Sequence, residues 1–225
     1  MLTSNRDEQV LREPAALPEP IQFEHGKILF PRDGKAGGTW IALHNNGNAM
    51  VLLNGGFKRH IPEPPYRRSR GLIFLDIFDS ERPELVFEQI RLTNIEPFTL
   101  VIWSNRKLFE ARWDGKGKYL TPRSATTPHI WLSSTLYDDR VIELRKKWFL
   151  KWLDSTAYKI VDSIRNFHEF GGEDGESVFL RMNDEGILQT VSITSIEIKN
   201  NNNAVMCYKD ILGGIVSVNE WHLKQ

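Results

Sequence analysis

The stretch Gly34–Asn54, GKAGGTWIALHNNGNAMVLLN, holds two apolar runs on either side of one glycine turn. The runs are Thr39–Leu43 and Ala49–Leu53, and between them stands Asn46-Gly47, the dipeptide that most readily supplies the two positive φ angles of a type I′ turn. The sequence therefore predicts a β-hairpin closed by a type I′ turn. Both runs are nearly continuous in apolar residues, which is typical of strands in a sheet that is covered on both faces. A layered architecture follows from this one stretch.

Further strands are expected around a second hairpin. The segments Phe98–Trp103 and Lys107–Trp113 are rich in β-branched and aromatic residues, and they flank Ser104-Asn105. Asp114-Gly115 then turns the chain into a third strand, so a meander is predicted. Residues 187–221 return to strand-forming composition.

Four helices are expected between and beside these strands. An apolar segment over residues 71–78 predicts the first, and Ser80 predicts the N-cap of a second, because serine accepts a hydrogen bond from the first turn. In residues 137–153 large apolar side chains recur at spacings of three or four, which predicts a long amphipathic helix. A fourth helix is predicted over residues 157–168, before Gly171-Gly172 ends it. This order of elements favours the α+β class over alternating β-α units.

Composition limits the classes of function. One domain over residues 1–225 is expected, and the 29 basic and 29 acidic residues balance, so no global attraction to nucleic acid or to an anionic membrane is implied. No apolar run is long enough for a membrane span, and the single cysteine, Cys207, suits a reducing, cytoplasmic location. The six histidines lack metal-binding spacing, so neither a metal nor another cofactor is expected.

Five short motifs occur in order along nearly the whole chain. Together they resemble the NRDE family of the transport and Golgi organisation type, which is named after the first of them. The motifs are Asn5-Arg6-Asp7-Glu8, the Gly34–Asn54 stretch with its GGTW, Ser69-Arg70-Gly71, Pro128–Tyr137 (PHIWLSSTLY) and Thr190-Val191-Ser192.

The resemblance implies a four-layer αββα sandwich of the N-terminal-nucleophile hydrolase type. In the cysteine branch of that class the free α-amine, with a pKa near about 7.7 to 8.0, accepts the thiol proton. By the resemblance Arg6 would stabilise the thiolate, Asp7 would orient the amine and Asn54 would donate to the oxyanion. The candidate cleft or binding residues are Asn5, Arg6, Asp7, Glu8, Gly38, Thr39, Trp40, Asn54 and Ser134.

The sequence departs from the family pattern at two points. Family members usually begin Met-Cys and run one strand before the NRDE motif, so the nucleophile is expected upstream of the given start. Cys207 lies in an apolar run that predicts a strand interior, where an inert buried thiol is expected. Ser133-Ser134 stands where many relatives have Ser-Asn. Arg6 and Asp7 have a structural alternative as a buried ion pair, and Trp40 has one as a core residue.

The chain as given is therefore predicted to be a non-catalytic binding or trafficking protein for a lipid, acyl or haem-like ligand. The alternative is a cysteine N-terminal-nucleophile hydrolase of linear amide or acyl bonds, whose nucleophile lies upstream. A small-molecule ligand is the expected partner. A sheet edge left open at Leu2–Asn5 would also favour self-association, because unpaired strand edges pair with other chains.

Overall fold

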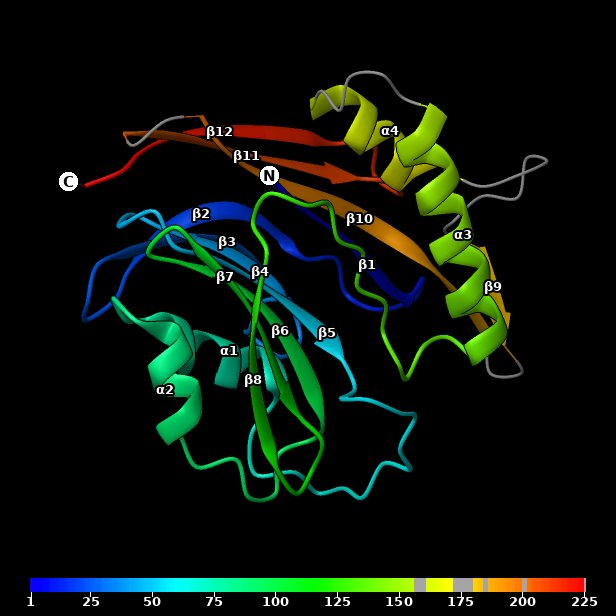
Figure 1. Ribbon diagram of the computed structural model, residues 1–225, viewed down its shortest axis with the longest axis horizontal. Helices are drawn as coiled ribbons and strands as arrows, with labels where there is room; N and C mark the ends of the chain where they lie inside the picture. The colour runs from blue at the N-terminus through cyan, green and yellow to red at the C-terminus, as the bar shows by residue number, and fades with distance from the viewer. Residues whose placement is uncertain (156–160, 172–179, 184–185, 200–201, 225) are drawn as a thin grey trace.

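Two antiparallel β-sheets pack face to face, with helices on the outer side of each (Figure 1). The computed structural model describes residues 1–155, 161–171, 180–183, 186–199 and 202–224. The smaller sheet has the order β1-β10-β11-β12, with β9 also paired to β10, and the larger sheet runs β2-β3-β4-β5-β6-β7-β8. The layers pass from α1 and α2 through the larger sheet and the smaller sheet to α4 (Figure 1). The expected α+β class with two stacked sheets is confirmed.

The elements have the following bounds. The smaller sheet contains β1 (Leu2–Gln9), β9 (Leu180–Asn183), β10 (Gly186–Ile198), β11 (Asn203–Asp210) and β12 (Val216–His222). The larger sheet contains β2 (Ala16–Gln22), β3 (Lys27–Arg32), β4 (Ile41–His44), β5 (Ala49–Asn54), β6 (Phe98–Ser104), β7 (Lys107–Trp113) and β8 (Lys118–Arg123). The helices are α1 (Arg70–Phe78), α2 (Pro83–Gln89), α3 (Asp139–Ser155) and α4 (Val161–Phe170).

The central strands of the larger sheet, such as β4 and β6, are buried on both faces, as their continuous apolar runs indicate. On β4, Ala42 belongs to the core beneath α1 and α2, while Ile41 and Leu43 belong to the core between the two sheets. The first core includes Phe74 and Phe78 of α1, which are fully buried. Successive side chains of a strand point to opposite faces, so a strand with a core on each side must be apolar at every position.

The hairpin of β4 and β5 forms as expected, but its type I′ turn does not. Only Gly47 has a positive φ, +90°, whereas both central residues of a type I′ turn need one. The backbone N–H of Asn46 donates to His44 Nδ1, and the Asn46 side chain accepts from Asn48 N, which fixes a different loop. The type I′ geometry occurs instead at Asn105 and Arg106, between β6 and β7, where φ is 49° and 61°.

The helix expectations hold with two corrections. Ser80 does not cap α2: its Oγ accepts from Arg82 N, and Arg82 itself occupies the cap position without a side-chain bond. Pro83 opens that helix and lacks an N–H, so one donor that a cap would satisfy is absent. The long helix begins at Asp139, and the predicted start of the fourth, at residue 157, lies outside the described residues.

Cys207 lies on a strand, β11, as expected. Its residue is only half-buried, whereas a buried thiol was expected.

Candidate functional site

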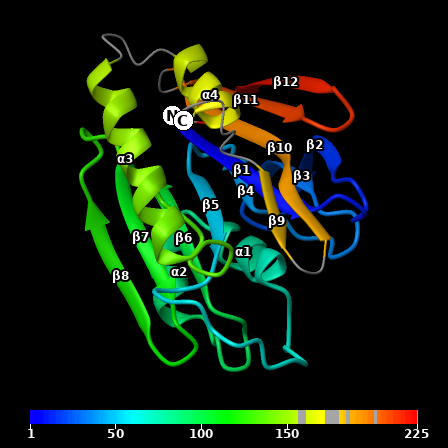
Figure 2. The ribbon, with the colours of Figure 1, turned by 90° about the vertical axis from the view of Figure 1, so that its right-hand side faces the viewer.

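A cavity of about 1670 Å³ lies beside β1. All residues from Met1 to Glu8 line it, and since strand side chains alternate, the cavity must contact both faces and the edge of β1. Among the described strands β1 pairs only with β10, so its other edge opens into this space. Further walls come from residues 38–40, β5, the 125–137 loop, α3 and α4, with α3 and β1 on either side of β5 in the view of Figure 2. The volume exceeds that of most small-molecule sites, which measure about 300 to 1,000 Å³.

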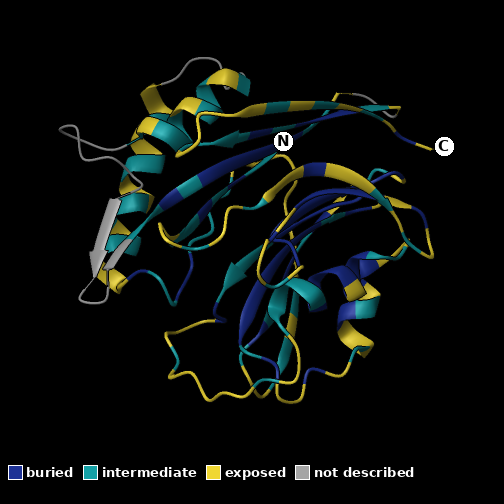
Figure 3. Ribbon diagram, turned by 180° about the vertical axis from the view of Figure 1, so that it is seen from behind, coloured by how far each residue is buried: buried dark blue, intermediate teal, exposed yellow. Residues whose placement is uncertain are grey.

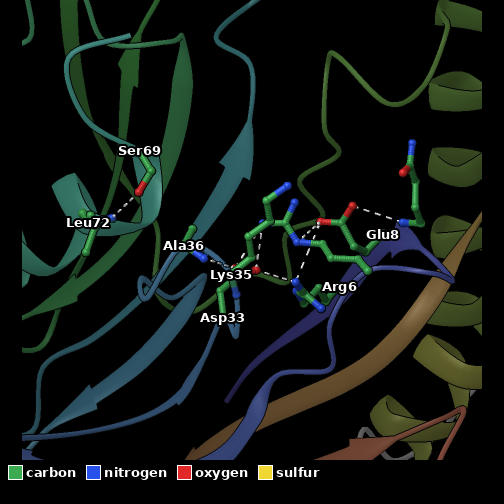
Figure 4. A network of polar contacts seen from close by, with 9 residues as sticks. Arg6, Glu8, Asp33, Lys35, Ala36, Ser69 and Leu72 are labelled. Carbon is green, nitrogen blue, oxygen red and sulfur yellow. Dashed lines mark hydrogen bonds and ion pairs between the residues drawn. The ribbon is translucent and has the colours of Figure 1, made fainter. Parts of the chain in front are cut away.

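Arg6 is held in a buried network on the inner face of β1, and Figure 4 shows its guanidinium directed at Asp33. Arg6 Nη2 donates to Asp33 Oδ2 at 2.5 Å, and Arg12 Nη2 donates to both Asp33 oxygens at 3.0 and 3.1 Å. The backbone N–H groups of Lys35 and Ala36 donate to Oδ1. Burial alone would raise the pKa of Asp33, but the bonds from Ala36 and Arg12 lower it below its usual value. Arg6 thus ties β1 to the turn after β3.

Trp40 and Glu8 complete this network. The Arg6 guanidinium lies 4.8 Å from the centre of the Trp40 ring, a cation–π distance. Trp40 belongs to the core between the sheets and also borders the cavity. Glu8 lies 3.3 Å from Arg12 and 3.8 Å from Arg6. Arg6 is only 8% exposed and its charge is balanced by Asp33 and Glu8, whereas the ion-pair alternative had paired it with Asp7.

Gly38 and Gly71 bring the second and third motifs into direct backbone contact. A Cβ on Gly38 would lie 2.4 Å from the carbonyl carbon of Gly71, so no side chain fits there. Ser69 caps α1, with its Oγ accepting from Leu72 N at 3.3 Å. The hydroxyl of Thr39 is buried and donates to Ile41 O at 3.0 Å. These residues border the cavity, and each also stabilises the fold through a backbone contact, a helix cap or a buried hydrogen bond.

Asp7 joins three of the motifs. Its two oxygens accept from Tyr137 Oη and from Thr190 Oγ1, the latter at 2.5 Å. Burial and the nearby Asp7 carboxylate raise the pKa of Tyr137 well above its usual value, so the phenol remains a donor. The Arg145 guanidinium of α3 lies 3.9 Å from the Tyr137 ring centre. Val191 is skipped in the pairing of β1 with β10, because Arg6 pairs with Ser192 and Asp7 with Thr190.

Asn5 lies on the opposite face from Arg6 and binds α4. Its Nδ2 donates to the backbone O of His168 at 3.0 Å, and its Oδ1 accepts from His168 Nδ1 at 2.8 Å. Burial lowers the pKa of His168 to about 4, so the imidazole is neutral at physiological pH. His168 borders the cavity. Sequence reasoning missed it, because nothing in its helical spacing distinguishes it from its neighbours.

Asn54, at the end of β5, and Ser134, in the 125–137 loop, differ in whether they border the cavity. Asn54 borders the cavity, and its backbone O accepts from Ser133 Oγ at 2.9 Å. Ser133 borders the cavity as well, but Ser134 is not among the residues that do. The Ser134 Oγ is buried against Gly55 and has no hydrogen-bond partner in the described part of the chain. The structure therefore brings together every candidate of the sequence analysis except Ser134.

Glu110 fixes one aromatic wall of the cavity. Trp131 Nε1 donates to Glu110 Oε2 at 2.6 Å, while Arg112 and Arg123 donate to Oε1 at 2.8 and 3.0 Å. Burial alone would raise the pKa of Glu110, but the hydrogen bonds from Arg112, Trp131 and Arg123 lower it to about 2. The carboxylate is therefore ionised at neutral pH and anchors the Trp131 indole on β7.

The cavity wall combines aromatic rings with an excess of positive charge. Five of the seven tryptophans border it: Trp40, Trp103, Trp131, Trp148 and Trp152. Seven cationic side chains face four carboxylates, namely Arg6, Arg12, Arg68, Arg70, Arg106, Arg145 and Lys199 against Asp7, Glu8, Asp33 and Glu96. Within the described ranges no group of three or more potential metal ligands occurs. None of the described helices is long and apolar enough to cross a membrane.

Comparisons with known proteins give a family match and 33 structurally similar chains, one of which is a bile acid hydrolase. The model of the family described as Transport and Golgi organisation 2 matches residues 1–170. The crystal structure of a variant of conjugated bile acid hydrolase from Clostridium perfringens is similar with a TM-score of 0.48 and 10% identity, over 97% of this chain and 84% of that one. None of the curated proteins matches the sequence significantly.

Proposed function

The chain belongs to the Transport and Golgi organisation 2 family, and from this premise we propose that it binds an elongated amphipathic anion beside β1 without changing it chemically. The observation that carries this proposal is the cavity itself, which joins aromatic walls to an excess of cationic side chains. We place the protein in the cytoplasm, because its one cysteine suits a reducing compartment.

The aromatic side of the cavity suits an acyl chain or a similar apolar body. Phe149 and Trp152 of α3 stack at 6.0 Å between ring centres, and Phe167 of α4 packs against both. These rings border the cavity and remain half-buried. An apolar ligand that covers them would gain about 25 cal/mol for each Å² of apolar surface removed from water.

The charged side suits a carboxylate or a similar anionic group. Arginine is the majority of the cationic lining, and guanidinium groups bind carboxylates through paired hydrogen bonds. Arg6 and Arg12 already share Asp33, so we expect the ligand to interact with the summed field of the lining more than with either of these two groups.

Fluorescence titration tests the proposal, since five tryptophans border the cavity. Oleate should change the emission saturably, and oleyl alcohol, which has the same chain without the charge, should bind about tenfold more weakly, a difference of about 1.4 kcal/mol. Trp148→Ala should weaken oleate binding, whereas Trp221→Phe, on β12 outside the cavity, should not. Absence of saturable binding, or equal affinity for the alcohol, would contradict the proposal.

One observation favours the hydrolase alternative, namely that Arg6, Asp7 and Asn54 border the same cavity. In that hypothesis an upstream cysteine would supply the nucleophile beside them. Incubation of N-oleoylglycine with a chain extended upstream to that cysteine, and with the same chain carrying alanine in its place, followed by mass spectrometry, separates the two functions. Recovery of intact N-oleoylglycine from the protein supports binding, whereas release of oleate and glycine in proportion to protein concentration supports hydrolysis.

A further inference from the structure

Three loops gather at one end of the molecule, which is the lower end in the views of Figures 1 and 2. They are residues 55–69 between β5 and α1, residues 90–97 between α2 and β6, and residues 114–117 between β7 and β8. None of the three belongs to the smaller sheet, which contains β1. We call this end of the molecule the loop surface.

The first of these loops is fixed against the other two. The backbone N–H of Arg67 donates to Asn94 O at 2.9 Å, and Arg67 Nη2 donates to Arg91 O at 2.7 Å. Gly56 packs against the third loop, since a Cβ built on it would lie 3.0 Å from Asp114 Cα. A partner that binds here therefore does not first have to order the chain.

The loop surface carries an excess of positive charge, although the charges of the whole chain balance. Its exposed cationic side chains are Lys58, Arg59, Arg67, Arg68, Arg91 and Lys116. The same loops hold three acidic residues, Glu63, Glu96 and Asp114. Arg68 pairs with Asp76, but in the described part of the chain no ion pair joins the other five cations to a carboxylate. These charges remain available to an anionic partner.

Two exposed apolar side chains stand among these cations. Ile61 is 85% exposed, and Phe57 is 52% exposed with its ring edge-on to Tyr119 at 5.0 Å between centres. An isolated exposed isoleucine is ordinary on a protein surface. Apolar side chains surrounded by lysine and arginine are instead the pattern by which proteins bind the interface of an anionic membrane.

We propose that the loop surface binds an anionic lipid bilayer, with Ile61 inserted among the headgroups and the cations around it. This goes beyond the proposed function, because the partner is a bilayer and Lys58, Arg59 and Ile61 lie outside the cavity. Each cation close to such a membrane contributes about fivefold in affinity. Nucleic acid suits this surface less well, because a phosphate backbone offers no apolar contact to an exposed isoleucine.

Vesicle flotation tests the proposal on the full chain. The probes are vesicles of phosphatidylcholine alone and of phosphatidylcholine mixed with phosphatidylserine. The chain should bind the mixed vesicles at least about tenfold more tightly, and added salt should weaken this binding because it screens the charges. Equal binding to the two kinds of vesicle, or none to either, would overturn the proposal. This comparison needs no variant, so it does not depend on the folding of any substituted chain.

Two double variants show whether the loop surface makes the contact. Lys58→Gln with Arg59→Gln should weaken binding to the mixed vesicles about 25-fold, because two cations are lost. Lys27→Gln with Lys107→Gln is the matched control, since both lysines are exposed and lie at the opposite end of the larger sheet. The seven residues of β7 span about 20 Å, well over the Debye length of about 8 Å, so the control should stay within about threefold of wild type. Equal losses would mean that another surface binds.

Ile61→Ser separates a membrane from other anionic partners. It should weaken binding to the mixed vesicles about fivefold and leave the salt dependence unchanged, because it removes an apolar contact and no charge. Duplex DNA is measured in the same buffers. Binding to DNA as tight as to the vesicles, with no effect of Ile61→Ser on either, would contradict the membrane assignment. The oleate titration concerns the cavity, so either proposal can fail alone.

Discussion

The helices on the two sides of the molecule differ in how deeply their side chains are buried. Five side chains of α1 are buried, including Phe74 and Phe78, whereas the described residues of α3 and α4 are half-buried or exposed. Figure 3 shows the contrast, with dark blue on the strands and α1 and only teal and yellow on α3 and α4. α1 and α2 complete a core, while the rings of α3 and α4 contact one another and border a cavity. We therefore expect stability to depend on the α1 and α2 side, and the proposed ligand binding to depend on the α3 and α4 side.

The largest expected effect tests this division directly. Phe78→Ala should lower the free energy of unfolding by about 3 to 5 kcal/mol, because it leaves a cavity in a closed core. Phe149→Ala on α3 should lower it by roughly 1 kcal/mol, since its ring is only half-buried, and should weaken oleate binding instead. Urea unfolding of both variants measures the difference. Equal losses of stability would mean that α3 belongs to the folding core.

The contact between Gly38 and Gly71 sharpens the comparison on the α1 side. Gly38→Ala should lower the free energy of unfolding by about 2 to 3 kcal/mol, because the new Cβ would meet the backbone of α1 and force it to move. Gly37→Ala is the matched control: no atom lies within 4 Å of its Cβ position, and only its φ of +71° costs roughly 1 kcal/mol. The order of the two thermal midpoints checks this, and the reverse order would show that α1 is free to shift.

Glu110 links the cavity wall to the rigid sheet, and its effect depends on pH. The folded pKa, about 2, lies below the usual 4.5, so its stabilisation is complete above about pH 4.5 and is lost as pH falls toward 2. Glu110→Gln should lower the free energy of unfolding by roughly 2 kcal/mol at pH 7. It should also remove part of the decline of wild-type stability between pH 4.5 and 2. A variant with an unchanged acid profile would exclude Glu110 as its source.

The smallest effect concerns the two serines before α1 and α2. Ser69→Ala should lower the free energy of unfolding by about 1 kcal/mol, because its Oγ caps α1 at Leu72 N. Ser80→Ala should lower it by about half as much or less, since Ser80 bonds the backbone before α2 and does not cap the helix. Denaturant midpoints of the two single variants test the order, which the sequence alone would have made equal.

Short sequence patterns predicted the features of the fold that depend on neighbouring residues, such as the buried strands. The doubly covered strands followed from the apolar runs at residues 39–43 and 49–53, because burial on both faces requires apolar residues at each position. The turn at Asn46 was mispredicted because the side chains of His44 and Asn46 supply hydrogen bonds that dipeptide statistics ignore. Asn105-Arg106 is the converse, a type I′ turn on a dipeptide with no glycine.

The candidate site was predicted as a set of residues but not as a set of contacts. The motifs identified Arg6 and Asp7, yet their partners Asp33 and Tyr137 lie 27 and 130 residues away along the chain. Only the fold brings such groups together, and no periodicity in one sequence reports it. Ser134 was expected at the site because it stands where many relatives have asparagine, but adjacent residues point in different directions, and Ser133 is the one that borders the cavity.

The skipped residue Val191 makes one position of β10 tolerant of a change in chain length. Between Arg6 and Asp7 the pairing advances by one residue on β1 and by two on β10. Deleting Val191 would leave Arg6 opposite Ser192 and Asp7 opposite Thr190, now in a regular ladder. Residues that pair directly share a face of the sheet, so Thr190 would stay on the side of Asp7 and the hydrogen bond to that carboxylate would be kept. The extra residue thus changes the local twist of β10 and not which side chains share a face.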